Sequence, residues 1–177
     1  MNKKNHNPMV LLRHTTKADL KLLRYWDTKP HVIEASPNDD WGWEIELNRN
    51  PDWREWFIAE ADGKPIGFIQ IIDPAREDTH YWGDVPDGLR AIDIWIGEED
   101  YLGKGYGTKM MELAIDRCFE NPEVTAVLLD PLATNTCSHR FYERLGFRFV
   151  EQRRFGEDDC YVYKLNREDW HDRKSNN

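Results

Sequence analysis

The chain has 177 residues, of which 40 % are hydrophobic and 32 % are charged, a composition typical of one globular domain with a substantial core. Its formal net charge of −9 argues against a nucleic acid as partner, because the phosphates would be repelled, and favours a cationic substrate. No apolar run is long enough to span a membrane, and the N-terminus lacks the apolar core of a secretory signal. We therefore expect a cytoplasmic protein with no membrane partner.

The first half of the chain predicts a strand, two helices and a β-hairpin. Alternating or helical spacing of apolar residues sets the type of each element, and Asp62-Gly63 is a typical hairpin turn. The predicted elements are a strand over 10–13, a helix from Thr16 to Trp26, a helix over 41–48, and strands over 56–60 and 65–72.

The second half predicts alternating strands and helices. The predicted elements are a strand over 90–96, a helix over 109–119, a strand over 124–129, a helix over 134–145, and strands over 147–151 and 161–165. This order indicates an α/β fold with a mixed central sheet and helices on both faces. We expect a single domain over residues 1–177, in which residues 171–177 form a frayed polar tail.

The cysteines follow no metal-binding or disulfide pattern. Cys118, Cys137 and Cys160 stand alone, and their number is odd. The sequence therefore predicts no bound metal.

Three glycines alternate in the stretch Leu102-Gly103-Lys104-Gly105-Tyr106-Gly107-Thr108, between a predicted strand and a predicted helix. Glycine allows a tight turn, and the N–H groups at a helix N-terminus attract anions, so we expect a phosphate or pyrophosphate here. A glycine-rich surface turn is the alternative. The spacing differs from the Rossmann pattern, and Gly105 stands where a P-loop requires Ser or Thr.

This loop resembles the pyrophosphate loop of the GNAT acyl-CoA N-acyltransferases, usually Arg/Gln-x-x-Gly-x-Gly/Ala, although Leu102 replaces the usual Arg or Gln. Residues 135–147, which read Asn-Thr-Cys-Ser-His-Arg-Phe-Tyr-Glu-Arg-Leu-Gly-Phe, resemble the second signature of that family, N-x-x-[A/S]-x-x-x-Y-x-x-x-G-F. Two signatures in the right order, separated by one strand, are much more specific than either alone.

The resemblance implies a GNAT fold, in which the parallel strands at 90–96 and 124–129 splay apart and the pantetheine arm of acetyl-CoA enters the gap. It also implies that Tyr142 lies near the thioester sulfur and returns a proton to the leaving thiolate. The alternative for Tyr142 is an ordinary aromatic side chain that packs in the core. The implied cofactor contacts are Ile94, Trp95 and Ile96 through their main chain, Leu102, Gly103, Lys104, Gly105, Tyr106, Gly107 and Thr108 at the pyrophosphate, and Asn135 from the following helix.

Two aspartates stand out by position. Asp93 interrupts the apolar strand Ala91–Ile96, and burying a carboxylate is costly unless it is paired or used, so we interpret Asp93 as functional. The alternative is a charge on an exposed strand face. Asp130 follows the strand at 124–129, at the edge where open α/β sheets bind ligands, although it could equally be a turn residue before Pro131.

Several stretches resemble the aminoglycoside 6′-N-acetyltransferases more narrowly, namely 88–93, 102–109, 121–125 and 130–131. This resemblance implies that Asp93 engages the acceptor amine and that Asp130 binds the aminoglycoside. It also implies an acidic contribution from the preceding loop, where Asp78 is the nearest match. Within that loop, Trp82 is the ring that we expect to pack on a sugar, and a core or loop-anchoring ring is the alternative.

Three functions remain open at this level. The first is an acetyl-CoA-dependent aminoglycoside 6′-N-acetyltransferase, acting as a monomer or homodimer. The second is a GNAT enzyme for another amine, such as a hydroxylysine siderophore precursor or a protein N-terminus. The third, a non-catalytic acyl-CoA-binding module, is disfavoured by the pairing of Asp93 with Tyr142.

Overall fold

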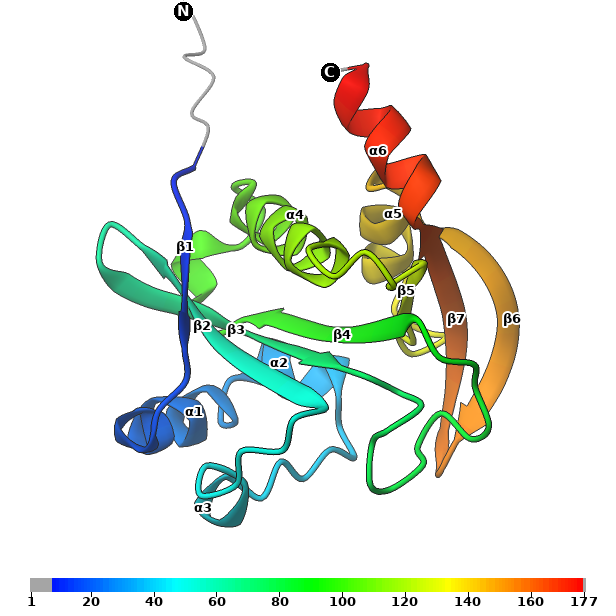
Figure 1. The fold of residues 1–177 in the computed structure, drawn as a ribbon. Coiled ribbons are helices and arrows are strands. Elements are labelled where there is room, and N and C mark those ends of the chain that lie inside the picture. The colour runs from blue at the N-terminus through cyan, green and yellow to red at the C-terminus, as the bar shows by residue number, and fades with distance from the viewer. Residues whose placement is uncertain (1–7, 177) are drawn as a thin grey trace, which may run out of the picture.

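The computed structural model describes residues 8–176 and builds them around one seven-stranded sheet, in the order β1-β2-β3-β4-β5-β7-β6 (Figure 1). The strands are β1 Leu11–His14, β2 Arg54–Ala61, β3 Lys64–Ile72, β4 Leu89–Ile96, β5 Ala126–Leu129, β6 Arg148–Phe155 and β7 Asp158–Asn166. The helices are α1 Leu20–Trp26, α2 Pro30–Ala35, α3 Trp43–Glu46, α4 Tyr106–Phe119, α5 Thr136–Arg144 and α6 Arg167–Ser175, with short 3-10 turns at Lys17–Asp19 and Glu99–Tyr101.

The centre of the sheet is split. Strands β4 and β5 pair in parallel only where residues 89–91 face residues 126–128. Beyond Ala91, β4 stays paired with β3 as far as Ile96, whereas β5 pairs with β7. The two strands therefore separate toward their carboxyl ends, which confirms the predicted mixed sheet with splayed parallel strands.

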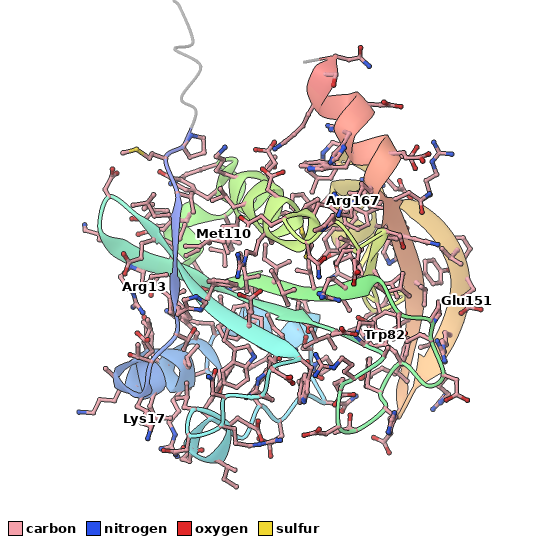
Figure 2. All side chains as sticks on the ribbon, viewed as in Figure 1. Arg13, Lys17, Trp82, Met110, Glu151 and Arg167 are labelled. Carbon is pink, nitrogen blue, oxygen red and sulfur yellow. The ribbon has the colours of Figure 1, made fainter. Side chains whose placement is uncertain are left out.

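Helices cover both faces of the sheet. Figure 1 shows α4 and α5 above it and α1, α2 and α3 below the first four strands. Successive side chains of a strand point to opposite faces, so Phe57 packs in the core that contains Met110 of α4, while Trp56 and Ile58 pack in the core that contains Trp26 of α1. Figure 2 shows side chains filling the space on both faces of the sheet, with Met110 labelled at α4.

A third apolar cluster lies where the lower face has no helix. Here the loop between β3 and β4 covers β5 and β7, and Trp82 of that loop packs against Phe155 at a ring-centroid distance of 5.2 Å. This anchoring matters for the site because the same loop carries Glu77 and Asp78, which line a pocket beside the sheet.

The structure contradicts the prediction of a frayed C-terminal tail. Residues 167–175 form α6, Trp170 is 2 % exposed, and its Nε1 donates a hydrogen bond to Asp116 at 2.9 Å. Lys174 donates to the same carboxylate at 2.6 Å. The partner lies 54 positions earlier in α4, so the polar composition of the tail gave no sign of it. Residue 177 and residues 1–7 of the predicted domain lie outside the described residues.

Helix α2 is a second difference, because no helix was predicted between residues 27 and 40. Pro30 occupies its first turn, where the missing N–H costs nothing and the fixed φ favours a helix. The element matters for the site because His31 on α2 hydrogen-bonds the main-chain carbonyl of Ile96 at 2.8 Å. This contact ties α2 to the open end of β4.

Candidate active site

A groove opens where β4 leaves β5. It has a volume of about 510 Å³, and its lining includes the end of β4, the glycine loop and the first residues of α5. Gly103 and Gly105 adopt φ values of 67° and 87°, which non-glycine residues rarely adopt, and Gly105 is the N-cap of the 14-residue helix α4. The turn thus directs the free N–H groups of a long helix toward the groove, which is the arrangement that binds phosphate.

The predicted cofactor residues mostly meet in this groove. Its lining includes Ile94, Trp95, Ile96, Leu102, Gly103, Gly105, Gly107, Thr108 and Asn135. Lys104 and Tyr106 belong to the same turn but do not line it. Asn135 caps α5 by accepting a hydrogen bond from the main chain of Ser138 at 3.1 Å.

A smaller chamber of about 110 Å³ adjoins the inner end of the groove. Asn135 and Tyr142 line both spaces. On its other side the chamber shares Asp93, Asp130 and Tyr81 with a third pocket. The chamber is therefore the place where a molecule held in the groove would meet a molecule held in the third pocket.

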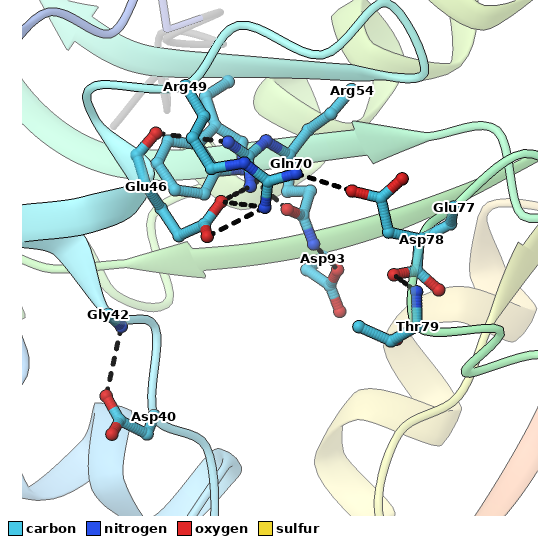
Figure 3. Close-up of polar contacts among 11 residues, drawn as sticks. Asp40, Gly42, Glu46, Arg49, Arg54, Gln70, Glu77, Asp78, Thr79 and Asp93 are labelled. Atoms are coloured by element: carbon cyan, nitrogen blue, oxygen red, sulfur yellow. Dashed lines mark hydrogen bonds and ion pairs between the residues drawn. The ribbon is translucent and has the colours of Figure 1, made fainter.

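The third pocket, with a volume of about 330 Å³, is strongly acidic. Its lining contains seven carboxylates and two arginines: Asp39, Asp40, Glu46, Glu77, Asp78, Asp93 and Asp130 with Arg49 and Arg54. Arg54 binds Glu46 at 2.6 Å, and Arg49 bridges Glu46 at 3.0 Å and Asp78 at 2.5 Å (Figure 3). The carboxylates outnumber the cations, so the pocket suits a ligand with several positive charges.

Asp93 faces the chamber from β4, and Asp130 faces it from the position directly after β5. Gln70 donates to Asp93 Oδ2 at 2.7 Å, and the Tyr81 hydroxyl donates to Asp130 Oδ2 at 2.6 Å. Burial, followed by repulsion from Asp130, raises the pKa of Asp93 well above its usual range. Burial likewise raises the pKa of Asp130. A carboxylate with a raised pKa is a stronger base than an exposed one, which suits proton transfer near neutral pH.

Tyr142 of α5 also lines the chamber. Its side chain is 9 % exposed and packs near Phe147 and Tyr163. Burial and the charges of Asp93 and Asp130 raise the pKa of its phenol. The hydroxyl therefore keeps its proton at neutral pH and can act as a donor.

The loop residues need a revised interpretation. Asp78 lines the acidic pocket as expected but is paired with Arg49. Trp82 also lines the pocket, yet it is 2 % exposed and packs on Phe155 in the third cluster, so it offers no open face to a sugar. The neighbouring residue, Tyr81, is 47 % exposed, and its hydroxyl donates the hydrogen bond to Asp130. The sequence singled out Trp82, and only the fold shows that this ring is buried while Tyr81 stays exposed.

Gln70 and Asp39 are site residues that sequence reasoning missed. Gln70 interrupts the apolar run 66–72, as Asp93 does in its own strand, and this shared pattern could have revealed it. Asp39 lines both the chamber and the acidic pocket, and its charge raises the pKa of both Asp93 and Asp130. It comes from an exposed loop with no periodic pattern, so no signal distinguished it.

Residues 15–155 match the family model of the acetyltransferase (GNAT) domain. Together with the splayed sheet and the glycine loop, this match shows that the chain belongs to the GNAT acetyltransferase family and is an acyltransferase. Acetyl-CoA is the co-substrate of these enzymes. Among residues 8–176, no group of three or more His, Cys, Asp or Glu is placed to hold a metal ion. In the same range, no helix is long and apolar enough to cross a membrane.

Within this family the chain is similar to aminoglycoside N(6′)-acetyltransferase type 1 from Klebsiella pneumoniae, with 32 % identity over 157 residues, 81 % of this chain and 76 % of the relative. A crystal structure of aminoglycoside acetyltransferase AAC(6′)-Ib in complex with coenzyme A and kanamycin superposes with a TM-score of 0.84 at 26 % identity, covering 94 % of this chain and 99 % of that one. The lysine N-acyltransferase MbtK of a Mycobacterium species is 21 % identical, over 90 % of this chain and 68 % of the relative.

Proposed function

We propose that this enzyme transfers the acetyl group of acetyl-CoA to the 6′-amine of aminoglycosides. The observation that carries the proposal is the continuity of three spaces: a groove with a phosphate-binding turn, a chamber between Asp93 and Tyr142, and a pocket lined by seven carboxylates. An aminoglycoside carries several ammonium groups, which match that acidic pocket. The similarity to aminoglycoside N(6′)-acetyltransferase type 1 supports the same acceptor.

In the proposed reaction, the glycine loop holds the pyrophosphate of acetyl-CoA and Asn135 contacts the cofactor. The pantetheine arm lies along the open edge of β4. Asp93 accepts a proton from the 6′-ammonium and orients the neutral amine, because an ammonium group has no lone pair for attack. Asp130, held by Tyr81, binds the acceptor beside it.

The amine nitrogen then attacks the thioester carbonyl. A carbon–nitrogen bond forms, the carbon–sulfur bond breaks, and Tyr142 returns a proton to the departing thiolate. The attacking nitrogen loses its second proton, which restores the phenol of Tyr142 through the chamber. The proton held by Asp93 is lost to solvent as the amide product and free CoA leave. No acyl-enzyme intermediate is required, because both substrates can occupy adjoining spaces at once.

The direct test is release of CoA thiol from acetyl-CoA with a panel of acceptors. We expect activity with kanamycin- and tobramycin-like drugs that carry a free 6′-amine, and none with analogues that have a hydroxyl at that position. Expression in a susceptible bacterium should protect against the first group only. Lysine derivatives, N-hydroxylated polyamines and peptides complete the panel, because MbtK is named as a lysine N-acyltransferase. Acetylation of one of these in place of any 6′-amino aminoglycoside would contradict the proposed acceptor.

The glycine loop gives a prediction for the co-substrate. Replacing Gly105 with valine places a β-branched residue at a φ of 87°, a strain that we expect to weaken acetyl-CoA binding about tenfold or more in isothermal titration calorimetry. The matched control is Gly63→Val, which imposes similar strain at a φ of 74° in a hairpin turn outside the groove. If both variants bind acetyl-CoA equally well, the loop does not hold the pyrophosphate.

The Arg49 bridge gives a prediction for the acceptor. Arg49→Gln removes a cation from the acidic pocket, so the KM for a polycationic acceptor should fall, whereas Asp78→Asn should raise it by up to about fivefold, the range of an exposed ion pair. Both effects should diminish in 0.5 M salt, because screening shortens the reach of exposed charges. A salt-independent KM in the wild type would contradict charge-based recognition. The KM for acetyl-CoA serves as the internal control.

A further inference from the structure

Trp56, Gln70 and Asp93 lie side by side across three neighbouring strands. Trp56 is paired with Gln70 between β2 and β3, and Gln70 is paired with Asp93 between β3 and β4. Directly opposed residues share one face of a sheet, so the three side chains form a row that ends at the chamber. Figure 3 shows Gln70 beside Asp93 in this row.

The hydrogen bonds along the row have only one possible direction. The indole nitrogen of Trp56 can only donate, and it lies 2.6 Å from Oε1 of Gln70. The carboxamide of Gln70 therefore accepts with its oxygen and donates with Nε2, which lies 2.7 Å from Oδ2 of Asp93. Trp56 thus decides which end of the carboxamide faces the carboxylate.

Trp56 is itself held in place by its neighbours. It is 9 % exposed and packs edge-on against Trp43 and Phe68, with ring centroids at 5.1 and 5.6 Å. The guanidinium of Arg54 lies 3.9 Å from its ring centroid. The donor at the start of the row therefore has little freedom to turn away.

Gln70 is the only group among the described residues that donates a hydrogen bond to Asp93. The other groups that face Asp93 are Asp130 and Asp39, which repel its charge, and the phenols of Tyr81 and Tyr142. One carboxylate oxygen is occupied by Gln70, and the other remains available to a ligand. We propose that Gln70, oriented by Trp56, is a positioning residue that aligns Asp93 for the acceptor amine and stabilises its negative charge.

This proposal rests on the proposed role of Asp93, and it predicts a change in pH dependence. Burial and Asp130 raise the pKa of Asp93, whereas the hydrogen bond from Gln70 lowers it. Gln70→Met keeps the length of the side chain but removes the donor, so the pKa of Asp93 should rise. The acidic limb of the kcat–pH profile should move to higher pH by about one unit or more, the effect of losing a hydrogen bond to a charged group.

The experiment compares three variants: Gln70→Met, Trp56→Phe and Trp43→Phe. Trp56→Phe removes the orienting donor and should shift the limb in the same direction by a smaller amount. Trp43→Phe is the matched control, since its indole belongs to the same cluster but donates to Asp27 at 2.6 Å, and the limb should not move. In an Asp93→Asn background, Gln70→Met should cause no further loss of kcat, because its partner charge is gone.

A second measurement needs no acceptor. The titration of Asp93, followed by carbon NMR of the free protein with Asp93→Asn used for assignment, should move to higher pH in Gln70→Met. A lower kcat with an unchanged limb and an unchanged titration would overturn the proposal and make Gln70 merely structural. A shifted titration in a protein that acetylates no aminoglycoside would instead leave the row intact and refute the proposed substrate. The two failures are therefore distinguishable.

Discussion

Asp93→Asn should lower the turnover of the 6′-amine by about a hundredfold or more, the usual contribution of a positioned general base. The amide keeps the shape of the side chain and can still accept the hydrogen bond from Gln70, so the loss reports the missing charge and proton acceptor. The affinity for acetyl-CoA should stay nearly unchanged. Steady-state kinetics at saturating acetyl-CoA, together with calorimetric titration of the co-substrate, would check both statements.

Asp130→Asn serves as the contrast, because Asp130 is also a carboxylate facing the chamber. Its loss should act mainly on the KM of the acceptor and much less on kcat. Equal effects of the two substitutions on kcat would mean that the proton acceptor is not Asp93 alone. Wild-type turnover in Asp93→Asn would remove Asp93 from the mechanism.

Asp93→Asn should also make the protein more stable than the wild type at pH 8. The pKa of Asp93 in the folded protein is raised above that of the unfolded chain, so the native state binds the proton more tightly and stability falls as pH rises between the two values. Above that window the ionised, buried carboxylate destabilises the fold, and asparagine removes the charge. We expect Asp93→Asn to have a higher Tm than the wild type at pH 8. The difference between the two Tm values should shrink toward pH 4, where Asp93 of the wild type is protonated. A lower Tm at pH 8 would contradict this assignment.

Tyr142→Phe should lower turnover by about ten- to a thousandfold while acetyl-CoA binding is kept, as expected for a lost proton donor. The ring remains, so the packing against Phe147 and Tyr163 is preserved. The loss should be smaller for acetyl thioesters whose thiols are more acidic, because those thiolates leave without protonation. A loss that is equal for all thioesters would contradict the role of general acid.

Tyr163→Phe is the matched control for this prediction. Tyr163 is 2 % exposed, its hydroxyl donates to Glu143 at 3.1 Å, and it does not line the chamber. Removal of this hydroxyl should change stability but not the dependence on the leaving group. If Tyr163→Phe reproduced the kinetic effect of Tyr142→Phe, the phenol of Tyr142 would be acting through packing.

The sequence by itself determined the elements of the cofactor half. Alternating glycines between a strand and a helix predicted the phosphate-binding turn, and the structure places Gly105 at the start of α4. A run of apolar residues predicted β5. The one carboxylate inside the strand at 90–96 marked Asp93 as a candidate site residue, and the structure places it in the lining of the chamber. These features are local, since backbone geometry and burial periodicity are decided within a few residues.

Only the tertiary structure decided how the acceptor half is assembled. The partner of Asp78 is Arg49, the donor to Asp93 is Gln70, and the ring that holds Asp130 is Tyr81 rather than Trp82. Each pair joins residues 23 to 49 positions apart, and no local pattern specifies such a contact. The same reason explains α6, whose polar sequence forms a docked helix because Trp170 and Lys174 both reach Asp116 on α4. Local sequence sets the conformation of a segment, whereas the free energy of burial and pairing between distant segments sets which side chains share a site.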